Sequence, residues 1–195
     1  LPDSQSQMSH SATYLTETVV VAGLLDPEDI EKMVKELVAL RERKGRLFVI
    51  GLGGSAANAS HAVNDFRKIC NIEAYAPTDN VAELTARAND EGWATIFDNE
   101  HWTANDAILV LSVGGGTVMV SLPLVRAIGR AQETGTRILG IVGKNGGCTA
   151  DHAHCCILIP TVEASRVTPH TEGWQAVVWH CLVSHPDLQR NKTKW

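Results

Sequence analysis

The stretch that decides the fold is RLFVIGLGGS, residues 46–55. Its first half is a short apolar run of the kind that fills a buried parallel strand. Its second half is a glycine-rich turn, and apolar residues at helical spacing follow over residues 55–69. A strand, a tight turn and a helix in this order predict an α/β protein built around a parallel sheet.

The same alternation continues on both sides of this stretch. Residues 26–44 predict a helix, because Asp26 precedes Pro27 at the first helical position and Gly45 follows the last turn. Further strands are expected at 72–75, 107–112, 137–143 and 156–160, and further helices at 80–88, 118–134 and 171–184. Continuous apolar strands between helices indicate a five-stranded parallel sheet covered on both faces, a three-layer α/β/α sandwich.

Length and composition fit one soluble domain. The chain has 195 residues, of which 44% are hydrophobic and 20% charged, so we expect a single domain over residues 1–195 with a poorly ordered segment at 1–14. No apolar run reaches the roughly 18 residues of a membrane span. The first residues lack the basic-then-apolar order of a signal peptide, and the five cysteines form no CxxC pair. These features predict a cytoplasmic protein without a membrane partner.

The charge balance argues against nucleic acid as a partner. Seventeen basic and 22 acidic residues give a net charge of −5, and the basic residues gather only at the end of the helix over residues 26–44 and just after it. Binding to a phosphate backbone needs a concentrated positive surface.

Two glycine-rich loops, residues 51–55 and 112–117, follow predicted strands. Loops after parallel strands meet at one edge of the sheet, so these two are expected to share a crevice and to lead into helix N-termini. Exposed amides there, with the hydroxyls of Ser55, Ser112 and Thr117, suit a phosphate group. The plainer alternative is that the glycines only turn the chain tightly.

A dinucleotide site is a third interpretation of the first loop. Gly51, Gly53 and Ala56 fit the GxGxxA fingerprint, and Glu73 lies near the distance expected of a ribose-binding acid. Against it, such a site uses one glycine loop, and here the following helix carries His61 and Asp65.

Histidines and carboxylates on two predicted helices form the candidate reactive centre. His61 and Asp65 are four residues apart and share a helix face. Glu172 and His180 are eight apart on the last helix, about 12 Å along its axis, so one metal could bind both only if Glu172 lies in a frayed first turn. Two imidazoles and two carboxylates are a plausible zinc set. His170 is expected near this site.

From about residue 15 to 185 the chain resembles the sugar isomerase (SIS) domain family, and within it the phosphoheptose isomerase branch. The resemblance rests on GLGGS at 51–55, on NDEGWATIF at 89–97, SVGGGT at 112–117 and GIVGKNGG at 140–147, and on the helix that contains WHCLV. It implies a flavodoxin-like sheet, a homotetramer with active sites between subunits, and one Zn²⁺ per subunit.

The resemblance also implies roles for individual residues. His61 and His180 match metal-binding histidines, Asp65 stands where the family has a glutamate that is ligand and base, and Glu172 where it has a glutamine. Asn89 and Asp90 match a substrate-contacting pair, and Lys144 matches a turn lysine. The implied metal ligands are His61, Asp65, Glu172 and His180, and the implied substrate contacts are Leu52, Gly53, Gly54, Ser55, Asp65, Asn89, Asp90, Ser112, Val113, Gly114, Thr117 and Glu172.

The implied reaction is aldose–ketose isomerisation of a sugar phosphate, with sedoheptulose 7-phosphate converted to D-glycero-D-manno-heptose 7-phosphate. A proton moves between C1 and C2 through an enediol, which needs a base, an acid and a group that stabilises the oxyanion. Asp65 is the expected base, His180 the expected acid, and zinc on His61 would polarise the carbonyl. The alternative is a non-catalytic SIS module that binds a sugar phosphate or a protein partner.

Overall fold

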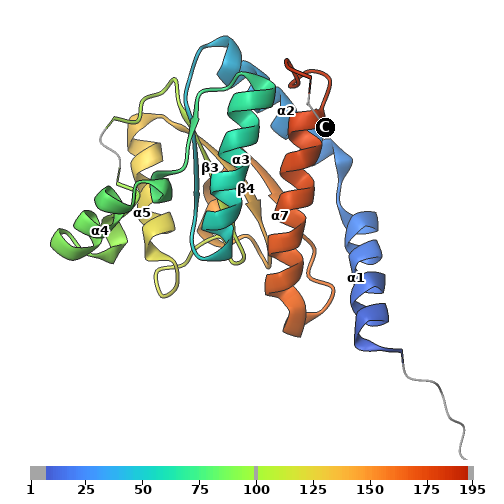
Figure 1. Ribbon diagram of the computed structural model, residues 1–195. Helices are drawn as coiled ribbons and strands as arrows, with labels where there is room; N and C mark the ends of the chain where they lie inside the picture. The colour runs from blue at the N-terminus through green and yellow to red at the C-terminus, as the bar shows by residue number, and fades with distance from the viewer. Residues whose placement is uncertain (1–7, 99–100, 193–195) are drawn as a thin grey trace, which may run out of the picture.

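A computed structural model describes residues 8–98 and 101–192 and shows three layers, with helices on both faces of a central sheet (Figure 1). The α-helices are α1 (His10–Leu24), α2 (Pro27–Glu42), α3 (Gly54–Cys70), α4 (Val81–Asp90), α5 (Leu122–Thr134), α6 (Gly147–His152) and α7 (Val167–Ser184). The strands are β1 (Leu47–Gly51), β2 (Ala74–Tyr75), β3 (Ala107–Ser112), β4 (Arg137–Val142) and β5 (Cys155–Leu158). Short 3-10 turns are η1 (Pro77–Asp79), η2 (Trp93–Thr95) and η3 (Ala164–Arg166).

All five strands are parallel, in the order β2-β1-β3-β4-β5. The predicted sandwich is therefore confirmed. The chain reverses its direction across the sheet between β1 and β3, which is the switch point where ligands bind in open α/β sheets. Gly51 pairs with Leu111, so the two glycine-rich loops leave the sheet side by side.

The three central strands, β1, β3 and β4, are mostly apolar because each contributes to two cores. In β1, Leu47 and Val49 face the core beneath α2, α3 and α7, whereas Phe48 and Ile50 face the core beneath α5. Successive side chains point to opposite faces of a strand. All five residues of β1 are buried, which explains why its sequence shows no polar alternation.

Two helices begin at other residues than predicted. Helix α5 begins at Leu122 instead of residue 118, because Thr117 and Val120 hydrogen-bond to each other in a closed turn and Pro123 fixes the first turn of the helix. Helix α7 begins four residues earlier than residue 171. The second glycine loop consequently leads into a turn and not directly into a helix N-terminus.

The N-terminal segment is more ordered than expected over its described part. Residues 10–14 belong to α1, whose N-cap Ser9 accepts a hydrogen bond from the backbone of Ala12, while residues 1–7 lie outside the described ranges. Tyr14 stacks on His170 with ring centroids 4.4 Å apart. Glu17 lies 2.8 Å from His170 Nε2 and accepts a 2.8 Å hydrogen bond from Arg166 Nε. His170 therefore holds α1 against α7, away from the reactive centre where it was expected.

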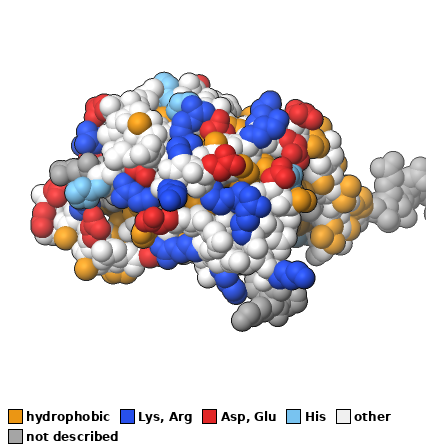
Figure 2. Space-filling model, turned by 90° about the horizontal axis from the view of Figure 1, so that it is seen from above, with side chains coloured by type: hydrophobic (Ala, Val, Ile, Leu, Met, Phe, Trp, Pro, Cys, Tyr) orange, Lys and Arg blue, Asp and Glu red, His pale blue; other side chains and the backbone are white. Residues whose placement is uncertain are grey.

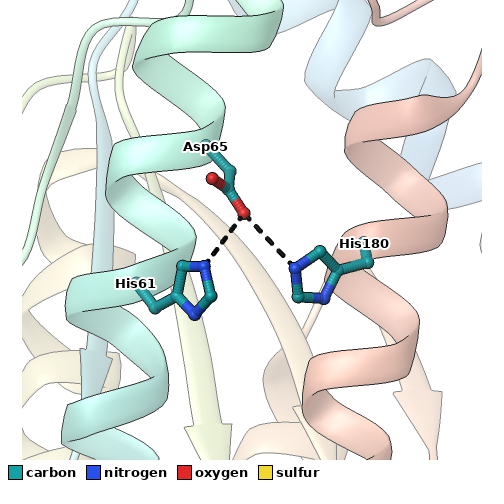
Figure 3. Close-up of side chains that lie close together, drawn as sticks. All are labelled: His61, Asp65 and His180. Carbon is teal, nitrogen blue, oxygen red and sulfur yellow. Dashed lines mark ion pairs between the residues drawn. The ribbon is translucent and has the colours of Figure 1, made fainter. Parts of the chain in front are cut away.

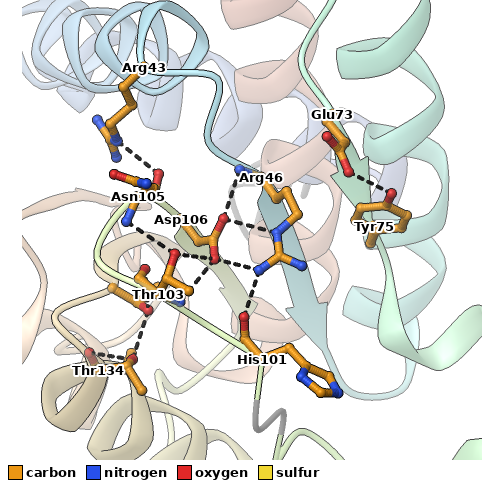
Figure 4. Close-up of polar contacts among 11 residues, drawn as sticks. Arg43, Arg46, Glu73, Tyr75, His101, Thr103, Asn105, Asp106 and Thr134 are labelled. Atoms are coloured by element: carbon orange, nitrogen blue, oxygen red, sulfur yellow. Dashed lines mark hydrogen bonds and ion pairs between the residues drawn. The ribbon is translucent and has the colours of Figure 1, made fainter.

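A polar network closes the edge where the strands begin (Figure 4). Arg46 donates from Nε and from an Nη atom to both oxygens of the buried Asp106, and Thr103 donates to the same carboxylate. Burial alone would raise the pKa of Asp106, but these hydrogen bonds outweigh it and lower the pKa. The network ties the start of β1 to the start of β3.

Seen from above, that is from this same edge, Lys and Arg side chains lie among Asp and Glu side chains (Figure 2). This face offers no uniform positive surface for a polyanion. None of the helices in the described ranges has the length and hydropathy of a membrane span.

Candidate active site

The two glycine-rich loops border one crevice of about 400 Å³ at the carboxyl ends of β1 and β3. From here on, the crevice means the space lined by Leu52, Ser55, Ser112, Val113, Gly114, Gly116, Thr117, Val120, Ser121, Lys144, Asn145 and Thr168. Six of the predicted substrate contacts line it: Leu52, Ser55, Ser112, Val113, Gly114 and Thr117. Gly53 and Gly54 precede Ser55 in the first loop.

The first loop leaves the N-terminus of α3 without a side-chain cap. Gly53 occupies the N-cap position with φ +60, a conformation that other residues adopt at a cost. A side chain at Gly51 would meet the backbone oxygen of Ser55 at 2.6 Å, so the chain can turn this tightly only with glycine there. Ala56 and Ala57 donate from their backbone N–H groups to the Gly53 carbonyl, which leaves the N–H groups of Gly54 and Ser55 at the start of α3 to bind an anion.

Helix α6 and hydrogen bonds within the loop fix the conformation of the second loop. Ser112 Oγ accepts a 3.0 Å hydrogen bond from the backbone of Gly115, and Thr149 Oγ1 donates to the Gly115 carbonyl at 2.7 Å. Gly115 has φ +70, and a methyl group there would lie 1.7 Å from the Gly146 carbonyl oxygen. The glycines thus serve close packing of two loops as well as the turn itself.

Lys144 adds a cation to the crevice. It follows β4 with φ +52, it is exposed, and its Cδ would lie 3.9 Å from a methyl group placed on Gly114. Within the described ranges, Lys144 forms no ion pair with a carboxylate. Hydroxyls, free backbone amides and an unpaired ammonium make the crevice suited to a phosphate group.

Helices α3 and α7 bring His61, Asp65 and His180 together (Figure 3). Asp65 Oδ2 lies 3.5 Å from His61 Nε2 and 3.6 Å from His180 Nε2. The imidazole side chains are 57% and 52% exposed, whereas the Asp65 side chain is 4% exposed. The carboxylate is therefore buried, whereas both rings face solvent. We call these three residues the His–Asp–His group.

Neighbouring groups fix the orientation of this group. Trp179 Nε1 donates to Asp65 Oδ2 at 3.3 Å, and Asn64 Nδ2 donates to Oδ1 at 3.1 Å. His180 Nδ1 lies 2.7 Å from the Ala176 carbonyl oxygen, which can only accept, so Nδ1 carries a proton. In a neutral ring, Nε2 would then direct a lone pair toward Asp65. A proton or a metal ion between the two removes this repulsion.

The His–Asp–His group fits a divalent metal. Ligand atoms of the three residues lie within 4.8 Å of one another. Zinc bonds of about 2.0–2.2 Å in a tetrahedron place neighbouring ligand atoms roughly 3.4 Å apart, close to the separations from Asp65. Three protein ligands, with the carbonyl of Ala176 orienting one imidazole, are typical of a catalytic site with an open position.

Glu172 lies outside this group, although the sequence suggested it as a fourth ligand. It is the sixth residue of α7, not part of a frayed end, and two helical turns separate it from His180. Its carboxylate lies against the start of α3, where a methyl group on Gly54 would be 2.5 Å from Oε2 and 2.7 Å from Oε1. Glu172 is half-buried there, against Gly54, which directly precedes Ser55 of the crevice.

Asn89 and Asp90 are also apart from the crevice in this chain. They are exposed at the end of α4, and Asn89 Nδ2 donates to Asp90 Oδ1 at 2.7 Å. Neither is among the residues that line the crevice.

Sequence reasoning missed the polar contacts that join the two helices. Asn58 Nδ2 donates to Gln175 Oε1 at 2.8 Å and to the Glu172 carbonyl at 2.9 Å, and Gln175 Nε2 donates to Ser55 Oγ at 3.1 Å. The residues of α7 that contact α3 are spaced three or four apart, or adjacent, along one face of the helix: Glu172, Gln175, Trp179 and His180. That periodicity was the available signal, and it also identifies Trp179.

The position of Glu73 argues against the dinucleotide interpretation. Its carbonyl accepts from Leu47, the first residue of β1, so Glu73 lies at the edge where the strands begin. Its carboxylate accepts from the Tyr75 hydroxyl at 2.7 Å (Figure 4). A ribose-binding acid has to lie at the opposite edge, beside the glycine loop.

Comparison with known proteins gives a consistent set of relatives. Phosphoheptose isomerase of Rhodospirillum rubrum is 30% identical over 146 residues, which cover 71% of this chain and 73% of the relative. That of Citrifermentans bemidjiense is 31% identical over 153 residues, covering 74% and 77%. The structure of phosphoheptose isomerase from Neisseria gonorrhoeae superposes with a TM-score of 0.76 at 21% identity, covering 89% of this chain and 95% of that one. No protein-family model matches the sequence.

Proposed function

The chain belongs to the phosphoheptose isomerase family of sugar-phosphate isomerases, and we propose that it converts sedoheptulose 7-phosphate to D-glycero-D-manno-heptose 7-phosphate. The observation that carries this proposal is that an ionisable His–Asp–His group and an anion-binding crevice lie along the same pair of helices. An isomerase of sugar phosphates needs both features, one to hold the phosphate and one to move a proton.

In this proposal the phosphate occupies the crevice. The N–H groups at the start of α3, the hydroxyls of Ser55, Ser112 and Thr117, and the ammonium of Lys144 surround it. Opposite charge and fixed donors hold the phosphate without taking part in the reaction. An extended seven-carbon chain reaches about 9 Å from phosphorus to C1, at roughly 1.2 Å per bond, so C1 and C2 extend away from the loops along α3 and α7.

The proton transfer is assigned to groups on these two helices. His180 is half exposed and its ring is oriented by Ala176, so it can exchange a proton with a sugar oxygen as the acid. Two carboxylates, Asp65 and Glu172, can be considered for the base. An enediolate that forms between them and the imidazoles is stabilised by any positive charge on those rings.

We also propose that His61, Asp65 and His180 hold one Zn²⁺ per chain. Support comes from the separations of their ligand atoms and from the hydrogen bond that orients His180. When bound, the metal would supply a Lewis acid that polarises the sugar carbonyl. His61, Asp65 and His180 would lie beside the carbonyl end of the substrate.

A homotetramer with sites between subunits is part of the proposal. Helix α1 exposes Leu15, Val19 and Leu24, which are 60–71% accessible, beyond what a lone soluble helix usually presents. Asn89 and Asp90 lie outside this chain's own crevice, as expected of residues that contact substrate in a neighbouring subunit.

The test is an assay with sedoheptulose 7-phosphate and analysis of the metal content. We expect turnover, about one zinc per chain, and a loss of turnover of at least about a hundredfold in His61→Ala. If the protein binds the sugar phosphate but isomerises no heptose, hexose or pentose phosphate, it is a binding module. The turn at Thr117–Val120, which lengthens the second loop, is the observation that favours that second candidate.

A further inference from the structure

We propose that Glu17 of α1 is a positioning residue for phosphate binding, which acts by holding the first turn of α7 against the loops that border the crevice. For the reaction, this role rests on the proposed function, which it deepens. The starting observation is a carboxylate that joins α1 to α7 and that takes no part in the proton transfer.

Glu17 binds two residues of α7 at once. Arg166 donates from Nε to Oε2 at 2.8 Å and from an Nη atom to Oε1, while His170 Nε2 lies 2.8 Å from Oε2. The ring of His170 also stacks on Tyr14, which is one helical turn before Glu17. A bidentate pair between two planar groups fixes direction as well as distance. The Glu17 side chain is 14% exposed, so water competes little for its oxygens.

The first turn of α7 has few constraints of its own. Arg166 is the N-cap residue, and its side chain makes no capping hydrogen bond within the part of the chain that the structure describes. Thr168 and Pro169 are exposed. A helix start without a cap frays easily. Because Glu17 binds the residue before this turn and His170 at its end, it fixes the turn from outside the helix.

The same turn borders the crevice. Thr168 lies between the two residues that the carboxylate binds, and it lines the crevice. Thr171 is 1% exposed and packs on Gly143, where a methyl group would overlap its Oγ1 and lie 2.9 Å from the Val113 carbonyl oxygen. Gly143 directly precedes Lys144, the cation of the crevice. A shift of this turn would therefore displace one wall of the crevice and the backbone that carries the lysine.

The His–Asp–His group should not be affected by such a shift. Thr168 and His180 are twelve residues apart, about 18 Å along the axis of α7. His180 is oriented by the Ala176 carbonyl, and Asp65 accepts from Trp179. These contacts are all within the second half of α7 or on α3. Loss of the contact with Glu17 should consequently weaken phosphate binding while metal binding and proton transfer stay the same.

The experiment compares Glu17→Gln, Arg166→Gln and the double variant in the whole chain. The matched control is Glu36→Gln, because Glu36 accepts the same two hydrogen bonds from Arg137, Nε to Oε2 and an Nη atom to Oε1. The exposed fractions of those side chains, 23% and 35%, are also similar. That pair joins α2 to the first residue of β4, at the edge of the sheet opposite the crevice.

Binding of inorganic phosphate, measured by titration calorimetry, is the first readout. In Glu17→Gln and Arg166→Gln we expect Kd for phosphate and KM for sedoheptulose 7-phosphate to rise at least about fivefold. Removal of a negative charge by itself would tighten phosphate binding, so a weakening in Glu17→Gln reports position and not charge. The double variant should bind phosphate about as weakly as the single ones, since all three lack the same contact.

The second readout separates a positioning role from a merely structural one. We expect kcat, and zinc affinity measured by competition with a chromogenic chelator, to stay within about twofold in Glu17→Gln, because only the binding of the phosphate has changed. Denaturant unfolding should show a similar loss of stability in Glu17→Gln and Glu36→Gln, whereas Kd for phosphate should be unchanged in Glu36→Gln.

Two results would overturn the role of Glu17. One is a Kd for phosphate in Glu17→Gln that equals or falls below that of the unmodified protein. The other is a Kd that rises as much in Glu36→Gln as in Glu17→Gln, which would make the effect one of general stability. Phosphate binding without isomerisation of any sugar phosphate would contradict the proposed function and leave this role intact. Absence of phosphate binding in the unmodified protein would contradict both.

Discussion

The indole Nε1 of Trp179 donates a hydrogen bond to Oδ2 of Asp65 across 3.3 Å, and this contact joins α7 to α3 at the reactive centre. The Trp179 ring also packs against both imidazoles, with centroids 5.3 Å from His61 and 4.9 Å from His180. One buried side chain thus orients the carboxylate and supports both rings. Residues that hold metal ligands in this way often matter nearly as much as the ligands.

Trp179→Phe should weaken metal binding more than it weakens the fold. Phenylalanine keeps most of the ring contacts but cannot donate to Asp65. We expect zinc affinity to fall about 10- to 100-fold, and the free energy of unfolding to fall by about 1 kcal/mol. Metal titration and denaturant unfolding measure the two effects. Trp174→Phe, at a half-buried position of the same helix, should leave zinc affinity unchanged.

Gly54→Ala should displace Glu172 while the protein stays folded. The new methyl group would lie 2.5 Å from Oε2, closer than such atoms approach, so the flexible carboxylate has to move. We expect turnover to fall about tenfold or more, since a shift of about 1 Å in a reacting group can cost a hundredfold. Alanine is itself favoured over glycine in helices by about 1 kcal/mol, so stability should change little.

Gly173→Ala is the matched control for this substitution. It adds the same methyl group beside Glu172 in sequence, within α7, where nothing lies within 4 Å. We expect unchanged turnover and a free energy of unfolding higher by up to about 1 kcal/mol. Equal turnover in Gly54→Ala and Gly173→Ala would show that the place of Glu172 against α3 has no effect on the reaction.

The sheet could be predicted because burial on both faces leaves a clear trace in the sequence. Residues 107–112 are all buried, and this run of five apolar residues followed by Ser112 matches β3 at both ends. The start of α5 could not be predicted in the same way. Val118, Met119 and Val120 have the composition of a buried helix face, yet they are 68–89% exposed in a turn closed by Thr117.

The reactive centre could be predicted only where its residues share a helix. His61 and Asp65 are one turn apart on α3, and the spacing alone puts them together. His180 joins them because α7 packs beside α3, a tertiary contact that no local pattern encodes. The same packing separates Glu172 from the group, since two turns of α7 carry it to the other end of the contact.

Acid should weaken the contact between α1 and α7 through Glu17. Hydrogen bonds from Arg166 and then from His170 lower the pKa of Glu17 to about 2, against an ordinary value of 4.5. A carboxyl with a lowered pKa stabilises the folded state fully above its unfolded pKa, and the contribution is lost as the pH falls from 4.5 to about 2. Glu17→Gln should therefore destabilise the protein at pH 7 and have progressively less effect below pH 4.5.

Chemical denaturation of both proteins between pH 2 and pH 7 measures this difference. The control is Glu133→Gln, because the Glu133 side chain is 69% exposed and its ion pair with Arg130 is solvated. We expect almost no effect of that change at any pH, since exposed pairs contribute little. If the free energies of unfolding of the unmodified protein and of Glu17→Gln differ by the same amount at every pH down to 2, the role given to Glu17 is contradicted.

Lys144→Met should weaken substrate binding without slowing the proton transfer. Lys144 lines the crevice, and in the proposed function its ammonium would bind the phosphate equally in the ground state and the transition state. Loss of such uniform binding raises KM and leaves kcat unchanged. We expect KM to rise about tenfold and its dependence on salt to become weaker, because one attraction between exposed charges has been removed.

Lys32→Met, which breaks an ion pair with Asp29 on α2, should leave KM unchanged. A fall in kcat with KM unchanged in Lys144→Met would instead place the lysine beside the reacting carbons.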